Sequence, residues 1–205
     1  MMTKSEIRTF ALSQFSRYGL ESVSMDDIAH ELKISKKTLY EHFSSKEQLV
    51  FEILDCCRED WEANSLTIKR NGENPIQKVF SFYLLHYAFI KKVSPDFINR
   101  SGKRYKDISR LIKQGRFFFR DTMQAFLTAA RKKGLLRKGL NIQTFLETEI
   151  ILFDHFITQI LPHDPRSFEL YQYFAFPRIL GIINPEKYDP EPDLSNLLEN
   201  FDKVG

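Results

Sequence analysis

The chain has little of what disulfide-linked secreted proteins and metalloproteins are built from. Its 205 residues include only two cysteines, together with eight glycines and eight prolines. Cys56 and Cys57 are neighbours on an expected helix, where adjacent side chains point about 100° apart. Such a pair forms neither a usual disulfide nor a pair of metal ligands. We therefore expect a reducing compartment, no metal site and no other cofactor.

Long apolar runs are missing as well. The first ten residues, MMTKSEIRTF, lack the apolar core of a signal peptide. Elsewhere, charged residues interrupt the apolar runs well before the roughly 18 residues that a membrane span requires. Valine-rich alternating stretches are absent, whereas patterns with a 3.6-residue period are long. We predict an all-α, cytoplasmic protein without membrane contact, whose 42% of hydrophobic residues can fill a substantial core.

The net charge of +3 is unevenly distributed along the chain. Residues 1–52 carry 7 Lys and Arg against 8 Asp and Glu, whereas residues 99–138 carry 13 against 2. A solvated basic face is the default interpretation of the second stretch, and an acidic ligand or supplementary DNA contact is a weaker alternative. Because the first stretch is not basic overall, any cations there that bind nucleic acid must act by their placement.

Residues 24–49 show the pattern of two short helices with a tight turn between them and a third helix behind. Ser24 precedes Asp27 by three residues, the spacing of a capping box, which predicts a helix from about 25 to 32. Ser35 can cap a second short helix, and only three residues separate the two helices. Such a short connection forces a steep crossing, the geometry in which the second helix enters the major groove of DNA.

Helical periodicity continues on both sides of this motif. The other expected helices span residues 3–18, 44–69, 76–93, 96–101, 105–133, 142–161 and 167–183. The tail from Asn184 is acidic and contains three prolines. We expect this tail to be extended apart from one helical turn near residues 194–201.

The N-terminal quarter closely resembles the TetR family of bacterial one-component transcriptional regulators. The resemblance covers about residues 5–52 and rests on the segment ISKKTLYEHFSSKEQL together with Phe15, Gly19, Met25, Ile28 and Ala29. It implies a helix-turn-helix DNA-binding domain at 1–50 and a larger helical domain at 51–205, with the acidic, proline-containing tail at 184–205. It further implies a homodimer that binds a palindromic operator, acts most simply as a repressor, and is released by a small-molecule inducer.

The same resemblance places DNA contacts at specific positions. With the helix cap Ser35, these positions are Ser24, Lys36, Lys37, Thr38, Tyr40, His42 and Lys46. Two departures from the family pattern stand out. Lys33 occupies a turn position where glycine is usual, and a left-handed backbone there has some energetic cost. Asp26 stands where relatives carry a polar or basic residue, so we leave it out of the contacts.

An independent physical argument supports the three lysines. Lys36, Lys37 and Lys46 each fall in the first turn of an expected helix, where the macrodipole disfavours a cation by about 0.3 to 1 kcal/mol. Phosphates bound at the helix N-termini would offset this cost. Alternatively, the lysines are solvated surface charges. Tyr40 is either a groove-facing hydroxyl or a packing aromatic, and His42 fits a phosphate neighbour or a half-buried packing residue.

The last two long helices carry more apolar surface than one small core requires. We expect them to pair with the same helices of a second copy, although a core within the chain is the alternative. The residues concerned are Phe145, Ile150, Leu152, Phe153, Phe156, Ile160, Leu170, Phe174, Ile179 and Ile182. Ligand-binding residues stay unassigned, because the aromatic sets at 83–90 and 117–119 fit a plain core better than a pocket wall.

Two other classes of function were weighed. A thiol hydrolase would use Cys56 or Cys57 with His86 or His155, but nothing in the sequence marks a nucleophile turn. We therefore expect no enzymatic activity. The second alternative is a helical ligand-sensing or protein-binding module that no longer binds DNA, and the departures at Asp26 and Lys33 are its best support.

Overall fold

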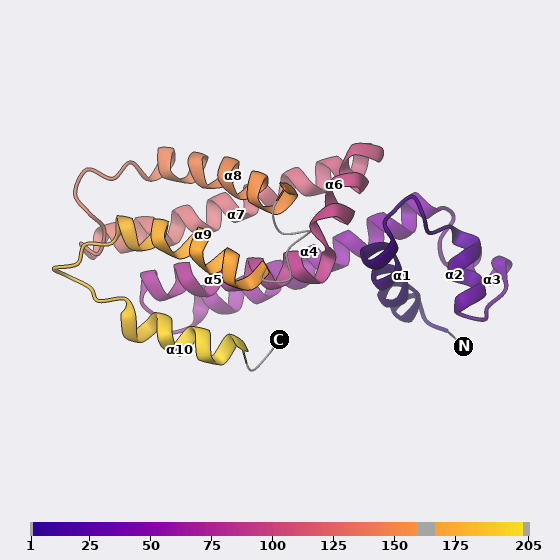
Figure 1. Ribbon diagram of the computed structural model, residues 1–205, viewed down its shortest axis with the longest axis horizontal. Helices are drawn as coiled ribbons and strands as arrows, with labels where there is room; N and C mark the ends of the chain where they lie inside the picture. Colours follow the sequence, from indigo (N-terminus) through magenta and orange to yellow (C-terminus); the bar gives the residue numbers. More distant parts are fainter. Residues whose placement is uncertain (1, 160–166, 203–205) are drawn as a thin grey trace. The chain divides into compact units, whose positions relative to one another are not determined.

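The computed structural model describes residues 2–159 and 167–202, and these ranges are built from helices (Figure 1). The all-α prediction is confirmed, because the described residues contain no strand beyond one isolated bridge, between Leu136 and Ile183. The helices are α1 (Lys4–Tyr18), α2 (Met25–Glu31), α3 (Lys36–His42), α4 (Lys46–Arg70), α5 (Pro75–Val93), α6 (Pro95–Arg104), α7 (Lys106–Lys132), α8 (Ile142–Gln159), α9 (Ser167–Ile182) and α10 (Glu191–Asp202).

The chain divides into two compact units. The first combines Met1–Asp60 with Lys91–Gly115, and the second combines Trp61–Ile90 with Arg116–Gly205. The helices α4, α5 and α7 are long enough to contribute to both units. The functional boundary expected near residue 50 falls inside α4.

The first unit is organised around the buried faces of α1 to α4 and α6. Ile7, Ala11 and Phe15 form the inner face of α1, at the i, i+4 spacing that places side chains on one side of a helix. The ring of Phe15 stacks on Phe97 of α6, with ring centroids 5.3 Å apart. Gly19 ends α1 with φ +87°, a conformation that side chains disfavour, so the predicted stop is confirmed.

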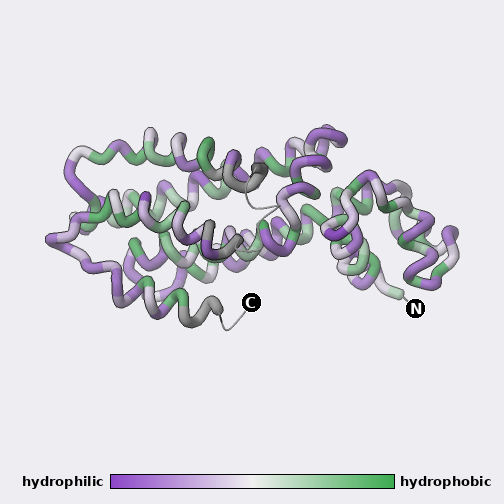
Figure 2. Tube along the Cα trace, in the orientation of Figure 1, coloured by the Kyte–Doolittle hydropathy of each residue, from purple (hydrophilic) through white to green (hydrophobic). Residues whose placement is uncertain are grey.

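The second unit has an aromatic core shared by α5, α7 and α9 with the C-terminal part of α4. Hydrophobic and hydrophilic residues alternate along these helices, as Figure 2 shows, which lets each helix bury one side and expose the other. Tyr83, Tyr87 and Tyr171 are among the largest fully buried side chains. The Tyr171 hydroxyl donates a hydrogen bond of 2.8 Å to the backbone carbonyl of Tyr83. Buried hydrogen bonds therefore stabilise this core together with apolar packing.

A buried ion pair joins α8 to α9 within this second unit. The Arg178 guanidinium donates two hydrogen bonds to the Glu149 carboxylate, of 2.6 and 3.0 Å, and the Tyr83 hydroxyl donates a third. Glu149 is almost fully buried, at 1% exposure. Burial of the Tyr83 hydroxyl, together with the charge of Glu149 and the hydrogen bond to it, holds the pKa of Tyr83 well above its usual value. The Glu149 carboxylate thus has an opposite charge and hydrogen-bond donors beside it, which a carboxylate in an apolar core requires.

The prediction of an extended tail is wrong for residues 191–202, which form the helix α10. Leu194, Leu197 and Leu198 pack against the core of the second unit, and this burial stabilises the helix. Asp193 at its start accepts hydrogen bonds from the Tyr188 hydroxyl and from the Gln77 side-chain amide. The contact with Gln77 connects residues 116 positions apart, which no local pattern reveals.

The apolar residues expected to face a second copy do not all lie at the surface. Ile179 and Ile182 are buried in the core of their own unit, so for them the expectation of a surface role was wrong. Leu152 is exposed. The partly buried members are Phe145, Ile150 and Phe174. The remaining four expectations fall on side chains that the structure does not describe, namely those of Phe153, Phe156, Ile160 and Leu170.

Other apolar side chains on these two helices are more exposed than the expected ones. Ile151 of α8 is 69% exposed and Tyr173 of α9 is 74% exposed. Leu180 lies seven residues after Tyr173, at the spacing of two helical turns, and is also exposed. We call Ile151, Leu152, Tyr173 and Leu180 the α8–α9 surface.

None of the helices in the described ranges combines the length and apolar character needed to cross a lipid bilayer.

Candidate nucleic-acid interface

The interface begins with the local geometry that positions α2 and α3. Ser24 caps α2: its hydroxyl accepts a 3.1 Å hydrogen bond from the Asp27 amide, while the Asp27 carboxylate accepts a 2.8 Å hydrogen bond from the Ser24 amide. The predicted capping box is therefore confirmed. The Ser24 hydroxyl also lies 2.7 Å from the Asp27 carboxylate, and its hydrogen bond to that carboxylate, with the one from the Ser24 amide, holds the pKa of Asp27 below its usual value. The capping box thus satisfies the amides of Ser24 and Asp27 at the start of α2.

The turn between α2 and α3 consists of residues 32–35. Lys33 has φ +54°, the left-handed conformation that favours glycine, so the structure accepts the strain expected at this position. The Ile34 amide donates a 3.0 Å hydrogen bond to the carbonyl of Ala29. This bond ties the turn back to α2 and fixes the direction in which α3 leaves it.

Buried side chains fix which face of α3 is turned outward. Leu39 and Phe43 are completely buried, as is Ile28 of α2. Lys36, Lys37 and Tyr40 therefore lie on the exposed side of the short helix. The structure thus gathers the sequence-predicted residues of α3 on one surface.

The two hydroxyls at the start of α3 bond to each other. Ser35 accepts a 3.0 Å hydrogen bond from the Thr38 amide, and the hydroxyls of Ser35 and Thr38 lie 2.8 Å apart. Ser35 is therefore the N-cap that the sequence predicted. Thr38 is half-buried and braces this cap.

Lys36 has a partner that the sequence did not reveal. Its ammonium lies 2.6 Å from the carboxylate of Asp26, with both side chains more than half exposed. The hydrogen bond and the charge of Asp26 raise the pKa of Lys36. Asp26 lies ten residues away in a preceding helix, so its carboxylate neutralises one cation of α3 across the turn.

Lys37 and Tyr40 are the most available of the predicted contacts on α3. Lys37 is exposed and makes no hydrogen bond or ion pair to any residue that the structure describes. Tyr40 is 47% exposed, which favours a groove-facing hydroxyl over a packing aromatic. His42 is half-buried, and its ring lies 6.4 Å from that of Phe43. His42 therefore lies at the edge of the surface that α3 exposes.

Lys46 stands at the start of α4, as expected, but its side chain is engaged with the protein. The ammonium donates a hydrogen bond to the backbone carbonyl of Leu20 and lies 5.5 Å from the centroid of the Phe15 ring. Partial burial lowers the pKa of Lys46. A phosphate would have to draw this ammonium away from Leu20.

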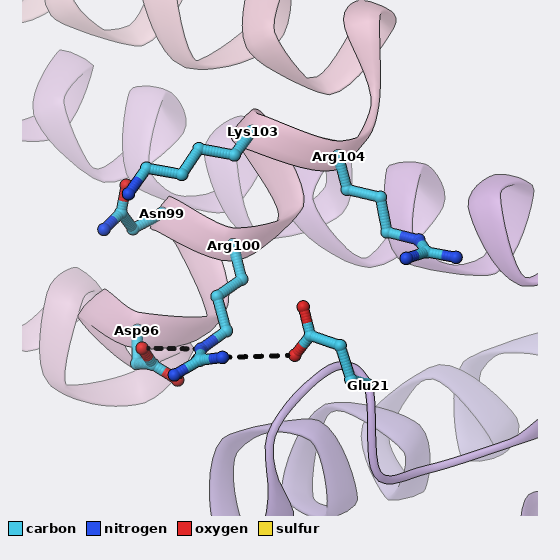
Figure 3. Close-up of a pocket in the computed structure, with 6 residues that line it drawn as sticks. All are labelled: Glu21, Asp96, Asn99, Arg100, Lys103 and Arg104. Atoms are coloured by element: carbon cyan, nitrogen blue, oxygen red, sulfur yellow. Dashed lines mark hydrogen bonds and ion pairs between the residues drawn. The ribbon is translucent and has the colours of Figure 1, made fainter.

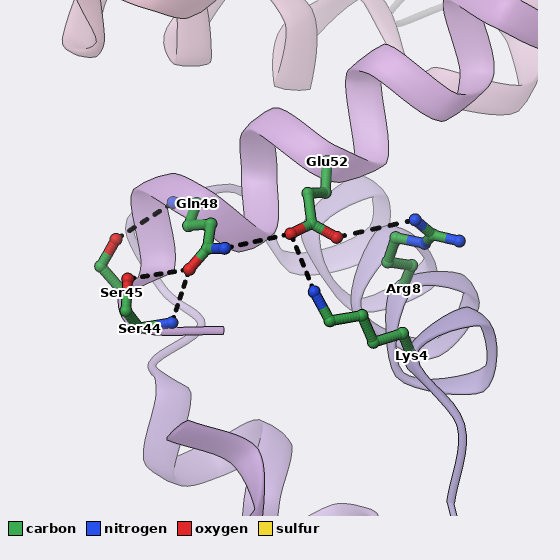
Figure 4. Close-up of polar contacts among 6 residues, drawn as sticks. All are labelled: Lys4, Arg8, Ser44, Ser45, Gln48 and Glu52. Atoms are coloured by element: carbon green, nitrogen blue, oxygen red, sulfur yellow. Dashed lines mark hydrogen bonds and ion pairs between the residues drawn. The ribbon is translucent and has the colours of Figure 1, made fainter. Parts of the chain in front are cut away.

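Polar contacts between α1 and α4 support the motif from behind (Figure 4). The Glu52 carboxylate lies 3.2 Å from the Lys4 ammonium and 3.6 Å from the Arg8 guanidinium. Gln48 links this group to the start of α4, because its side chain donates to Glu52 and accepts from the Ser44 amide. The Gln48 side chain therefore caps the Ser44 amide at the start of α4.

A polar pocket lies beside the loop that precedes α2 (Figure 3). It has a volume of about 480 Å³ and is lined by Glu21, Asp96, Asn99, Arg100, Lys103 and Arg104. Arg100 bridges the two carboxylates, at 2.7 Å from Asp96 and 3.4 Å from Glu21. Through Glu21 this arginine ties α6 to the loop that leads into α2. No local spacing in the sequence connects residue 21 with 96–104, so sequence reasoning missed it.

The two cysteines considered for thiol chemistry differ in their surroundings, because Cys56 is half-buried and Cys57 is buried. Cys57 is buried, and burial raises the pKa of its thiol, which disfavours the reactive thiolate. Within the described ranges, no group of three or more His, Cys, Asp or Glu side chains could hold a metal ion.

Comparison with known proteins agrees with this geometry. Residues 7–53 match the model of bacterial regulatory proteins of the tetR family. The chain is 30% identical over 95 residues to the biofilm operon icaADBC HTH-type negative transcriptional regulator IcaR of Staphylococcus aureus, a match covering 46% of this chain and 50% of IcaR. It is 38% identical over 65 residues to the uncharacterized HTH-type transcriptional regulator YuxN of Bacillus subtilis, covering 32% and 22% of the two chains. The chain thus matches at most about half the length of these curated relatives.

Solved structures of similar fold cover nearly the whole chain. A TetR-family transcriptional regulator from Agrobacterium tumefaciens superimposes with a TM-score of 0.74 at 17% identity, covering 88% of this chain and 97% of that one. The ketosteroid transcriptional regulator KstR2 of Mycobacterium tuberculosis gives 0.65 at 22% identity, covering 88% and 95%. At these identities the likeness concerns the fold, and it extends to the helices beyond the N-terminal motif.

Proposed function

We propose that this chain, which belongs to the TetR family of bacterial regulatory proteins, represses transcription by binding operator DNA through α3. The observation that carries the proposal is the exposed surface of α3, where Lys37 and Tyr40 are available on a helix that Leu39 and Phe43 anchor from inside. The negative regulator IcaR is 30% identical to this chain over 95 residues, which favours repression over activation.

In the proposed complex, α3 lies in the major groove and α2 crosses the backbone. Lys37 and Tyr40 contact phosphate or base edges, and the capped N-terminus of α2 at Ser24 faces a phosphate. Lys36 exchanges the carboxylate of Asp26 for a phosphate oxygen. The remaining proposed contacts are Ser35, Thr38, His42 and Lys46.

The repressor acts as a homodimer in this proposal. A palindromic operator presents two half-sites about 34 to 36 Å apart, so two reading helices must be held by a symmetric interface. The α8–α9 surface supports this role because it exposes four apolar side chains on two helices that the Glu149–Arg178 ion pair links. Burial against a second copy would remove this apolar area from water.

A small-molecule inducer completes the proposal. An inducer that binds one conformation of the helical domain better than another shifts the population toward the conformation with lower DNA affinity. A regulator of this kind works in the cytoplasm, where it meets the chromosome. It needs no catalytic group, and the raised pKa of Cys57 agrees with that.

The proposal is tested by selecting fragments from sheared genomic DNA with the purified chain. We expect retained fragments that share a palindrome, with half-sites spaced by about one helical turn. Retention should fall steeply as salt rises, because lysine contacts to phosphate release counterions. Absence of retained duplex at low salt would contradict DNA binding.

One observation favours a second candidate, a ligand-sensing or protein-binding module without DNA affinity. Asp26 already neutralises Lys36, which leaves fewer cations on α3 for phosphate. In that case the protein would retain no duplex at any salt concentration, yet it would still form a dimer.

A further inference from the structure

Five of the six side chains that line the polar pocket of Figure 3 come from α6, so we call it the α6 pocket. These five are Asp96, Asn99, Arg100, Lys103 and Arg104, and the sixth is Glu21 of the loop between α1 and α2. Intervals of three and four residues place the five on one face of the helix. The pocket lies entirely within the first compact unit.

Packing on the other side of α6 fixes the direction in which the pocket face points. Phe97 and Ser101 are completely buried. A Cβ atom added at Gly102 would lie 2.6 Å from the Ile112 side chain of α7, so the two helices approach each other closely there. The lining side chains are thus carried by a packed helix, which holds binding groups more precisely than a loop does.

The charges in the α6 pocket are not balanced. Arg100 bridges the two carboxylates, Asp96 and Glu21. Lys103 is exposed and makes no hydrogen bond or ion pair to any residue in the described ranges. The Arg104 guanidinium donates a 3.2 Å hydrogen bond to the hydroxyl of its neighbour Tyr105, which carries no opposite charge. Two cations therefore line the pocket without an anion to neutralise them.

The excess positive charge extends to the start of α4. Partial burial is the largest cause that lowers the pKa of Lys46, and the charge of Arg104 is the next. The charge of Glu21 acts on Lys46 in the opposite direction. Repulsion between cations is unfavourable unless an anion lies near both.

The helix macrodipole does not account for these cations. The C-terminus of α6 favours positive charge in its last turn, where Lys103 and Arg104 lie. However, α6 ends at Arg104 and α7 begins at Lys106, so the positive N-terminus of α7 adjoins it and offsets part of that attraction. An anion from outside the chain would neutralise both side chains.

A phosphate group suits this pocket by charge and by geometry. A phosphate monoester carries nearly two negative charges at pH 7.5 and has three terminal oxygens. The Arg104 guanidinium can hold two oxygens as a fork, while the Lys103 ammonium reaches the third as a point charge. The pocket volume of about 480 Å³ falls within the range of small-molecule sites, so an organic group attached to the phosphate has room as well.

We propose that the α6 pocket binds the phosphate group of a small phosphorylated compound through Lys103, Arg104 and Arg100, and that this phosphate displaces Glu21 from Arg100. The contact that breaks is the longer of the two made by Arg100, at 3.4 Å against 2.7 Å to Asp96. Asn99 adds an amide donor beside the phosphate.

The displacement links the pocket to the start of α2. Glu21 lies three residues before the cap Ser24, and its contact with Arg100 ties that loop to α6. Its release frees the loop, so α2 is held less firmly and the affinity for operator DNA falls. This consequence rests on the proposed function, whereas the binding of phosphate does not.

The full chain, without DNA, is titrated at pH 7.5 and constant ionic strength with methyl phosphate and with malonate, a dianion whose oxygens belong to carboxylates. Nitrogen-15 correlation spectra follow the backbone amides of residues 96–104 and the Nε–H groups of arginine. We expect saturable shifts with methyl phosphate, with a dissociation constant on the order of 1 mM, and binding of malonate at least about threefold weaker.

Variants at exposed positions separate a built site from general attraction of anions. The double variant Lys103→Gln and Arg104→Gln should bind methyl phosphate at least about tenfold more weakly, because two charged donors are lost. Lys138→Gln removes an exposed cation from the second unit and should bind as the native chain does. Glu21→Gln should bind about threefold more tightly, because the phosphate no longer displaces a carboxylate.

Fluorescence anisotropy with a labelled operator tests the link to α2. Saturating methyl phosphate at constant ionic strength should weaken operator binding by about threefold in the native chain and leave the double variant unaffected. Unchanged affinity in the native chain would overturn the link.

Binding at the pocket is overturned if methyl phosphate gives no saturable shifts, if malonate binds as tightly, or if the double variant binds like the native chain. Because these titrations contain no DNA, their failure leaves the DNA-binding proposal standing. A chain that binds methyl phosphate but retains no duplex would contradict the proposed function alone.

Discussion

At the scale of single residues, Asp26 sets the charge that α3 presents. Its carboxylate pairs with Lys36, so a phosphate must displace an anion before this lysine contributes. Both side chains are largely exposed, so the pair contributes little to stability. We expect the Asp26–Lys36 pair to affect the affinity for DNA instead.

The variant Asp26→Asn should therefore bind DNA more tightly. It frees Lys36 and removes a negative charge from the surface that faces the backbone, so we expect affinity to rise by roughly threefold to tenfold at low salt. Fluorescence anisotropy with a labelled operator measures this. Glu186→Gln makes the same charge change at an exposed site in the second unit and should have no comparable effect. Unaltered or weaker binding by Asp26→Asn would speak against the assigned surface.

His86 should make the protein acid-sensitive. Its pKa is lowered to about 3 in the folded chain, while an unfolded histidine titrates near 6.5. Between these values the unfolded chain binds the extra proton, so stability is complete above about pH 6.5 and falls as pH drops, by about 1.4 kcal/mol per unit.

Urea unfolding of the native chain and of His86→Gln across pH 4 to 7 measures this contribution. The variant should show a shallower decline. His30→Gln alters an exposed histidine and should keep the native slope. Parallel curves for the native chain and His86→Gln would show that His86 does not titrate as burial requires.

At the scale of elements, the buried ion pair between Glu149 and Arg178 is the strongest polar link from α8 to α9. Removing the charge of one partner leaves the other desolvated, so Glu149→Gln should destabilise the fold by about 3 to 5 kcal/mol. Asp107→Asn removes one partner of an exposed pair with Arg110 and should change stability by less than about 1 kcal/mol. Thermal or urea unfolding of both variants gives the comparison. Equal losses would mean that burial does not strengthen the inner pair.

The elements themselves could be predicted where their signals are local. The boundaries of α1, α2 and α3 follow from caps within three residues, such as Ser24 with Asp27, and from Gly19 after α1. The helix α10 could not be predicted in this way, because the burial of its leucines depends on a core assembled from distant segments. Local propensity there favoured an extended tail, and tertiary burial overrode it.

The features of the candidate site can likewise be divided into those that local patterns predict and those that they do not. Ser35 as a cap and the outward position of Lys37 follow from helical periodicity. The partners of Lys36 and Lys46 do not follow from periodicity. Asp26 and the Leu20 carbonyl reach these lysines across turns whose geometry the sequence does not specify. Periodicity predicts which face a side chain occupies, but not which neighbour captures its charge.

At the scale of the whole molecule, the account requires two copies acting together. The α8–α9 surface is the proposed interface, and charges placed there would have to be buried in the dimer. The double variant Ile151→Glu and Tyr173→Glu should sediment as a monomer and bind the full palindrome at least about tenfold more weakly. Phe117→Glu alters an apolar side chain that is 56% exposed on α7 and should remain dimeric. A dimer in the double variant would place the interface elsewhere.

The central claim is that the exposed cation of α3 touches the DNA backbone or groove. Its most direct test is the salt dependence of operator binding for the native chain, Lys37→Ala, and the control Lys187→Ala, a lysine exposed in the second unit. We predict that Lys37→Ala weakens binding and reduces the slope of log affinity against log salt by about 1 per half-site, with Lys187→Ala unchanged. Native affinity and slope in Lys37→Ala would contradict the account.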